Sequence, residues 1–188
     1  TRIKASLAWL ERCENLLLQL AKEEIIDATH QHKLQKIILA LRTHSDEAWS
    51  LFEQTIESLD NLDSYENRSQ HAFELGVVPP EVLSVAKNLS SEYARLTSGL
   101  QDIASDLRQT MDEGVDLDKT RLAEQWYPIL GRNTDRAEAN RGLWVSYAQE
   151  DPEGSAPHAR WLSFTENDAG SDIGLSSSPV LAAENLQE

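Results

Sequence analysis

The segment from residue 80 to residue 113 carries the strongest periodic pattern in the chain. Apolar side chains recur there at steps of three or four, at Leu83, Ala86, Leu89, Tyr93, Leu96, Leu100, Ile103, Leu107 and Met111. This spacing places one continuous apolar stripe along a single long helix. Pro80 suits the first turn of that helix, and Gly114 suits its C-cap. A long helix with one apolar face needs other helices to cover it, so the pattern favours a helical bundle.

Weaker stripes predict three further helices, over residues 3–26, about 30–62 and 118–148. In the second of these, the polar stretch 43–46 either breaks the helix or lies on its solvent face, and we expect one continuous helix. In the fourth, residues 128–131 (Pro-Ile-Leu-Gly) are expected to kink or split the helix. Short connections between long helices are typical of an antiparallel bundle or a helical arm.

The C-terminal part has a different pattern. Residues 160–165 and 173–177 have strand propensity and flank a turn-like segment, so 159–177 is a candidate β-hairpin. A lone hairpin is only marginally stable in water. We therefore expect it to join a sheet that lies outside this chain.

These patterns predict a mainly α fold, an antiparallel long-helix bundle or arm with a small C-terminal β-hairpin. Residues 61–80 are rich in turn-forming residues and are expected to interrupt the helices. Ser178-Pro179 is expected to cap and open a last helix. The predicted division is a helical domain over 1–158, followed over 159–188 by the hairpin and the start of a helix.

Composition excludes several functional classes. The 188 residues include 17 Lys and Arg against 32 Asp and Glu, a net charge of −15, which excludes a general nucleic-acid coat but leaves room for a local basic stripe. One cysteine excludes an intramolecular disulfide, a four-thiolate iron–sulfur cluster and a cysteine-rich zinc site. No apolar run reaches the length of about 18 residues that a membrane span needs, and we expect a cytoplasmic protein.

Motifs for catalysis or cofactor binding are absent from the sequence. It contains neither a phosphate-binding loop of the Gly-x-x-x-x-Gly-Lys-Ser/Thr type nor Gly-x-Gly-x-x-Gly, so this chain alone is not expected to hydrolyse a nucleotide. Asp27 and His30 resemble half of a di-metal site, but without a second copy we predict a solvated helix start there, His32 included. Cys13 has no neighbouring histidine, so a structural role is expected. We assign no catalytic, cofactor-binding or metal-binding residue.

Two further groups of residues have a structural interpretation. The acidic turn after residue 111 lacks the twelve-residue spacing of a calcium loop, which favours a solvated turn. The tryptophans lie in apolar stripes or in the strand pattern, so core packing is expected rather than base stacking. They are Trp9, Trp49, Trp126, Trp144 and Trp161.

One basic feature remains as a candidate for DNA contact. On the helix predicted over 118–148, Arg121, Arg132 and Arg136 fall within about 60° of one another when each residue advances the helix by about 100°. These arginines flank the apolar face, where they could contact phosphates along a nucleic-acid path. The alternative is ordinary salt bridging to Glu124, Asp135 and Glu138, which are close in sequence.

A family resemblance extends this interpretation. Residues 71–90 read His-Ala-Phe-Glu-Leu-Gly-Val-Val-Pro-Pro-Glu-Val-Leu-Ser-Val-Ala-Lys-Asn-Leu-Ser, which resembles the corresponding stretch of DinG-type DNA helicases. The similarity continues through 121–122, 142–144 and 160–161, and it ends at 178–186. In that family the last segment resembles the return from an insertion into the first helicase domain.

The resemblance implies an arch-like helical insertion of an XPD-like, superfamily 2 helicase. The parent would couple ATP hydrolysis to 5′–3′ unwinding in DNA repair or replication, with ATP, Mg and an iron–sulfur cluster bound outside this segment. Its partners would be single-stranded DNA and the parent motor domains, and no functional residue of the family falls on this chain. The alternative is a free-standing acidic helical protein-interaction scaffold, which is not expected to end on strands without a sheet.

Overall fold

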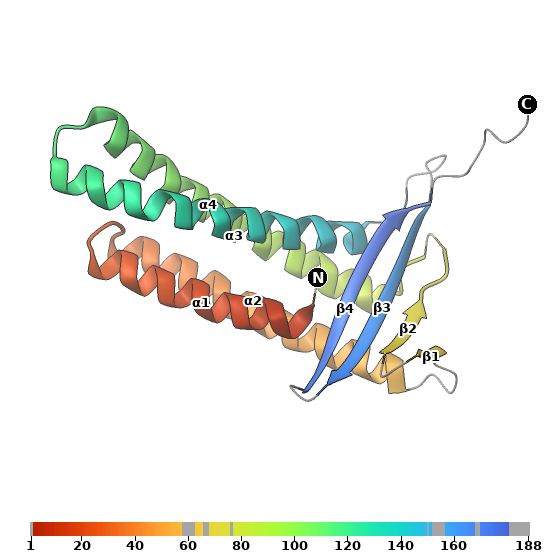
Figure 1. Cartoon of the computed structure of the whole chain (residues 1–188). Coiled ribbons are helices and arrows are strands. Elements are labelled where there is room, and N and C mark those ends of the chain that lie inside the picture. Colours follow the sequence, from red (N-terminus) through yellow and green to blue (C-terminus); the bar gives the residue numbers. More distant parts are fainter. Residues whose placement is uncertain are drawn as a thin grey trace, which may run out of the picture.

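A computed structural model gives the fold of this chain, and it describes residues 2–57, 63–65, 68–75, 77–149, 151, 157–167 and 170–180. The fold is mainly α with a small antiparallel sheet at one end, as the sequence predicts (Figure 1). The helices are α1 (Ile3–Lys22), α2 (Ala28–Glu57), α3 (Pro80–Glu113) and α4 (Leu117–Ala148). The strands are β1 (Asp63–Tyr65), β2 (Arg68–Ala72), β3 (His158–Asn167) and β4 (Gly170–Pro179).

The long helices follow the predicted periodicity closely. Helix α2 is continuous through residues 43–46, where Ser45 is buried and the Thr43 hydroxyl donates to the Leu39 carbonyl at 3.1 Å. Helix α4 runs unbroken past Pro128, so of the two predicted outcomes, a kink or a split, the split is wrong. Pro128 lies on the exposed side of α4, where its ring does not disturb the buried face.

The turn between α3 and α4 is built by local capping. Gly114 adopts a left-handed conformation with φ of 57° and ends α3, as predicted. Asp116 is the N-cap of α4, because its carboxylate accepts the backbone N–H groups of Asp118 at 3.0 Å and Lys119 at 3.2 Å. The acidic turn is solvent-exposed, in agreement with the interpretation as a solvated turn.

The sheet differs from the sequence prediction in one important respect. Its four strands have the order β1-β2-β3-β4, and all neighbours are antiparallel. The predicted hairpin is present as β3 and β4, but it pairs with β2 of the same chain rather than with an outside sheet. The sequence gives little sign of β2, because Arg-Ser-Gln-His-Ala lacks alternating apolar residues and is held extended by pairing with β3.

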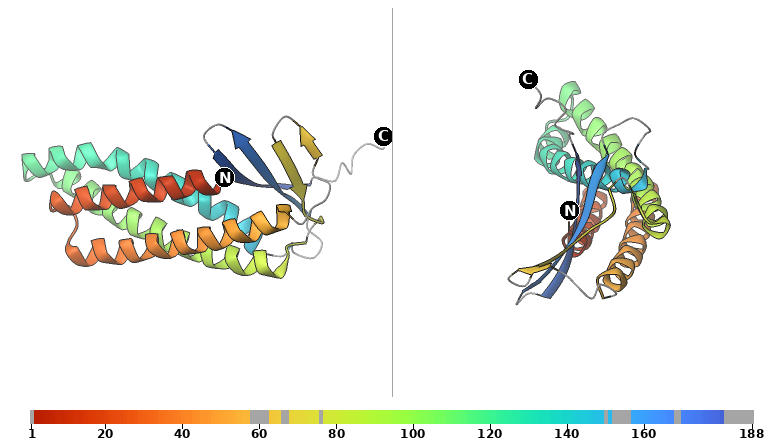
Figure 2. Two further views of the ribbon diagram at one scale, coloured as in Figure 1. Left: turned by 90° about the horizontal axis from the view of Figure 1, so that it is seen from below. Right: turned by 90° about the vertical axis from the view of Figure 1, so that its right-hand side faces the viewer.

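The sheet lies across one end of the helical body (Figure 2). Leu162, Ile173 and Leu175 are buried and face the helices, while intervening residues of β3 and β4 point to the other face. The beginning of α1 is attached to β4, because Arg2 forms a backbone bridge with Gly174. Ser178 and Pro179, where a last helix is predicted to begin, form the end of β4 instead. Residues 181–188, the rest of that predicted helix, lie outside the described residues.

A buried ion pair joins the end of α4 to β3. The Arg160 guanidinium, with a side chain 2% exposed, donates to the Asp151 carboxylate at 2.8 Å and, through Nε, to the Ser146 carbonyl at 2.6 Å. Asp151 also accepts the His158 backbone N–H at 2.8 Å. Nearby, the Tyr147 hydroxyl lies 2.7 Å from the Ser176 carbonyl and 3.2 Å from that of Trp161. These contacts fix the sheet relative to the bundle.

We expect Asp151→Asn to lower the free energy of unfolding by about 3 kcal/mol, because it leaves the Arg160 charge buried without a counterion. Urea denaturation measures this loss. The control is Glu138→Gln, which removes an exposed ion pair with Arg141 and should cost less than about 0.5 kcal/mol. An equal cost for the two variants would contradict a stabilising role for the buried pair.

The same carboxylate gives stability a dependence on acidic pH. Burial acts to raise the pKa of Asp151, but hydrogen bonds from Arg160 and His158 outweigh it and leave that pKa below its ordinary value. A depressed pKa means that the stabilisation is present above about pH 4 and is lost as pH falls through the folded-state pKa. Unfolding in urea at neutral pH and near pH 3 should show this loss in the wild type and a smaller one in Asp151→Asn.

The end of α1 is a Schellman turn with an unfavourable residue. The Glu24 N–H donates to the Ala21 carbonyl and the Ile25 N–H to the Leu20 carbonyl, which is the paired pattern of that motif. Glu24 takes the left-handed position with φ of 58°, where glycine is usual. A side chain in this conformation costs about 1–2 kcal/mol.

Glu24→Gly should therefore raise the free energy of unfolding by about 1 kcal/mol, because glycine relieves the strain at a smaller entropic cost. Chemical denaturation tests this. Glu24→Ala removes the same charge but keeps a Cβ atom, so it should give little gain. If both variants gain equally, the cause is the carboxylate near the helix C-terminus rather than the backbone conformation.

Candidate nucleic-acid interface

Helices α1 and α4 are joined by two tryptophans, one from each helix. The Trp9 indole N–H on α1 donates to the Asn133 amide oxygen on α4 at 3.0 Å. The Trp126 indole N–H on α4 donates to the Glu23 carboxylate at the end of α1 at 2.6 Å. We call these two contacts the tryptophan bridges. Both indoles are buried, so the bridges fix the spacing between the two helices.

A groove lies between α1 and α4 beside the tryptophan bridges, with a volume of about 410 Å³. We call it the α1–α4 groove. It is lined by Trp9, Arg12, Asn15, Leu16, Gln19, Trp126, Ile129 and Asn133. Among these lining residues there is one cation, three neutral polar side chains and no carboxylate. The groove is therefore a locally non-acidic surface on a strongly acidic chain.

Of the three candidate arginines, Arg136 is tied to this groove by a contact, because its guanidinium lies over the ring of Trp9, which lines the groove. Arg132 directly precedes Asn133, another lining residue, and both arginines are exposed on α4. Arg136 reaches across to α1, where its Nη2 donates to the Ala5 carbonyl at 3.4 Å. Arg121 is also exposed but lies eleven residues before Arg132, about 16 Å away along the helix axis.

The salt bridges proposed from sequence for these arginines are not formed. Within the part of the chain that the structure describes, no ion pair involves Arg121, Arg132 or Arg136, and Glu138 pairs instead with Arg141 at 2.7 Å. Their charges are therefore not neutralised by a neighbouring carboxylate. This leaves phosphate contact as a chemically reasonable role for them.

Sequence reasoning missed the contribution of α1 to this surface. Arg12, Asn15 and Gln19 fall at steps of three and four, so they share a helix face with Trp9 and Leu16. That face could have been found from the spacing. Its position opposite α4 could not, because it depends on how the helices pack.

The predicted role of the tryptophans holds for four of the five. Trp9, Trp126 and Trp144 are buried, and Trp49 packs against the core. Trp161 is the exception, because it alternates with buried Leu162 along β3 and therefore lies on the sheet face away from the helices.

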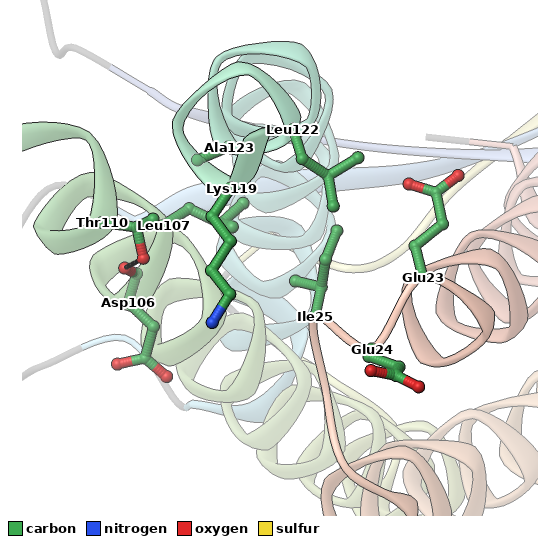
Figure 3. Close-up of a pocket in the computed structure, with 9 residues that line it drawn as sticks. All are labelled: Glu23, Glu24, Ile25, Asp106, Leu107, Thr110, Lys119, Leu122 and Ala123. Atoms are coloured by element: carbon green, nitrogen blue, oxygen red, sulfur yellow. Dashed lines mark hydrogen bonds between the residues drawn. The ribbon is translucent and has the colours of Figure 1, made fainter. Parts of the chain in front are cut away.

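A second pocket lies near the end of the bundle remote from the sheet, with a volume of about 270 Å³ (Figure 3). Glu23, Glu24 and Asp106 contribute carboxylates to its lining, and the Lys119 ammonium extends among them. Within the described part of the chain, no group of three or more His, Cys, Asp or Glu side chains has a metal-binding arrangement. A pocket whose carboxylates surround a lysine supplies no evident catalytic chemistry.

The other residues considered from sequence have structural contacts. Asp27 caps α2, because its carboxylate accepts the His30 backbone N–H at 2.7 Å, and this hydrogen bond is the main cause that lowers the pKa of Asp27. His32 is exposed on the first turns of the same helix. Cys13 is buried, and burial raises the pKa of its thiol to about 12, which makes it a poor nucleophile.

The groups expected in a parent helicase do not fit this chain. The sequence lacks a phosphate-binding loop, and a four-thiolate cluster cannot form around one buried cysteine. None of the described helices contains an 18-residue stretch apolar enough to cross a membrane. Neither a scan against protein-family models nor a search of curated proteins finds a match for the chain.

We expect Trp126→Phe to destabilise the fold by about 2 kcal/mol, because it removes a hydrogen bond to a charged acceptor as well as buried area. Chemical denaturation measures the loss. Trp144→Phe is the matched control, since Trp144 is similarly buried and contributes a ring contact with Tyr147. If Trp126→Phe lowers the free energy of unfolding no more than the control does, the hydrogen bond to Glu23 does not stabilise the packing of α1 against α4.

Proposed function

We propose that this chain is a non-catalytic, arch-like helical arm of a DinG-type, ATP-dependent 5′–3′ DNA helicase that acts in DNA repair or replication in the cytoplasm. In this proposal the α1–α4 groove contacts the sugar–phosphate backbone of single-stranded DNA and helps to shape its path. The observation that carries the proposal is the local charge. Arg12 lines the groove, Arg136 contacts Trp9 of its lining, and no carboxylate is among the lining residues.

The shape of the molecule supports an arm that projects from a larger protein. Helix α3 has 34 residues, which corresponds to a length of about 51 Å. The turns between α1 and α2 and between α3 and α4 lie at the end remote from the sheet (Figure 1). At the other end, Arg2 pairs with Gly174 of β4. Pro179 ends the same strand five residues after Gly174, which corresponds to about 17 Å. A helical body inserted into another domain needs its two connections on one side in this way.

The resemblance to the helicase family falls at a structurally meaningful position. Residues 71–90 run from the end of β2 into the first turns of α3, which is the junction between sheet and arm. In the proposal, ATP, Mg and the iron–sulfur cluster belong to the parent motor domains, since this sequence has no phosphate-binding loop and only one cysteine. The chain itself would contribute only contacts to DNA and to those domains.

A free-standing acidic interaction scaffold is the second candidate, and one observation favours it. The hairpin β3–β4 completes a sheet with β2 of its own chain, so it does not need a sheet from a parent protein. The strands therefore no longer argue against a self-contained scaffold. DNA binding by the groove separates the two candidates, because the scaffold has no need for it.

The proposal is tested by fluorescence anisotropy of a labelled oligothymidine of about 20 nucleotides, titrated with the purified 188-residue chain between about 50 and 200 mM salt. We expect binding that weakens as salt rises. The double variant Arg12→Ala/Arg132→Ala should bind more weakly, with a salt slope smaller by about 1.4, since each lost phosphate contact on a single strand removes about 0.7.

Arg95→Ala is the control for loss of positive charge alone. Arg95 lies on α3, outside the α1–α4 groove, and pairs with Glu92 at 2.8 Å. The Arg95→Ala variant should bind the oligonucleotide with the same affinity as the wild type. Absence of binding by the wild-type chain, or an equal effect of Arg95→Ala, would overturn the proposed role of the groove, and absence of binding would favour the scaffold.

A further inference from the structure

Three side chains form a series from the bundle core to the surface at the edge of the α1–α4 groove. Tyr93 is wholly buried on α3, and its ring stacks with that of Trp9 at a centroid distance of 6.4 Å and an interplanar angle of 19°. The Arg136 Cζ atom lies 5.6 Å from the centroid of the Trp9 ring, and Arg136 itself is exposed. The series therefore ends at the surface in a guanidinium group.

Arg136 is positioned without being neutralised. Its donation to the Ala5 carbonyl on α1 and its contact with Trp9 restrain the guanidinium. In the described part of the chain this is the one hydrogen bond that Arg136 makes, so most of its five N–H donors remain for a ligand. A restrained, planar and fully charged group at the edge of a groove is suited to a planar partner that also carries negative charge.

We propose that Arg136 is the stacking platform for an unpaired nucleobase of single-stranded DNA. This inference rests on the proposed function, and it adds recognition of the base plane to the backbone contacts of Arg12 and Arg132. Trp9 is only 4% exposed, so the indole supports the guanidinium from behind and does not itself receive a base. Guanidinium planes stack readily on bases, and every base offers a face for stacking.

The arrangement selects single-stranded over duplex DNA. In a duplex the base faces are covered by their neighbours, so a stacking platform gains nothing from them. In a single strand the phosphates can lie along the exposed Arg12 and Arg132 while one base turns toward Arg136. The groove would then bind DNA without regard to sequence but with a preference for strands that carry bases.

The test compares two labelled oligonucleotides of equal length, an oligothymidine and an abasic oligomer with the same phosphates, by fluorescence anisotropy on the 188-residue chain. We expect the wild type to bind the oligothymidine about tenfold more tightly, as one stacked base would provide. Arg136→Lys keeps the positive charge but replaces the planar guanidinium with an ammonium group that offers no flat face. It should reduce this preference to less than about twofold and leave the salt slope unchanged.

Arg132→Ala is the matched control, because it should lower the salt slope and keep the preference for the oligothymidine. Equal affinity of the wild type for the two oligonucleotides overturns the stacking role while the backbone role of the groove stands. A preference that persists in Arg136→Lys also overturns it, since the base then stacks elsewhere. Failure of the wild type to bind either oligonucleotide overturns both this inference and the proposed function.

Discussion

The apolar stripe of α3 has to be covered by other helices, and this requirement arranges the bundle. Its central residues Tyr93, Leu96 and Leu100 are fully buried, and α2 and α4 cover them from two sides. Helix α1 then packs on α2 and comes to lie beside α4, which it reaches through long side chains. Large indoles fill that seam at Trp9 and Trp126. The groove is thus a consequence of how a long central helix is covered.

Much of this architecture follows from local patterns in the sequence. Helical periodicity predicts the four helices, because an apolar stripe at steps of three and four is a property of each segment alone. The pairing of β2 was not predictable in the same way, since its strand conformation depends on β3, which is far away in sequence. For the site, Arg121, Arg132 and Arg136 could be singled out from the sequence as basic residues on one helix face, but the sequence left open whether they form salt bridges. Arg12 could not be joined to them without knowledge of the helix packing.

The sheet changes how the two functional hypotheses compare. Arg160 and Asp151 attach β3 to the end of α4, and Arg2 attaches the start of α1 to β4. The sheet is therefore an integral part of the helical body. A sheet of this kind suits a rigid base from which an arm projects, and it equally completes an independent domain. The chemistry of the groove, more than the topology, distinguishes the two.

The contrast between the negative net charge of the molecule and the positive charge beside the groove has a physical consequence for DNA binding. A net charge of −15 repels phosphates from the molecule as a whole, and at physiological salt both this repulsion and the attraction by each arginine are screened over about 8–10 Å. We therefore expect the isolated chain to capture DNA slowly and to bind it with low but measurable affinity. In the proposed helicase, a strand already held by adjacent motor domains would have a high effective concentration at the groove, so weak contacts would be sufficient. The acidic surface would then disfavour retention of DNA elsewhere on the arm, as a surface that guides a moving strand requires.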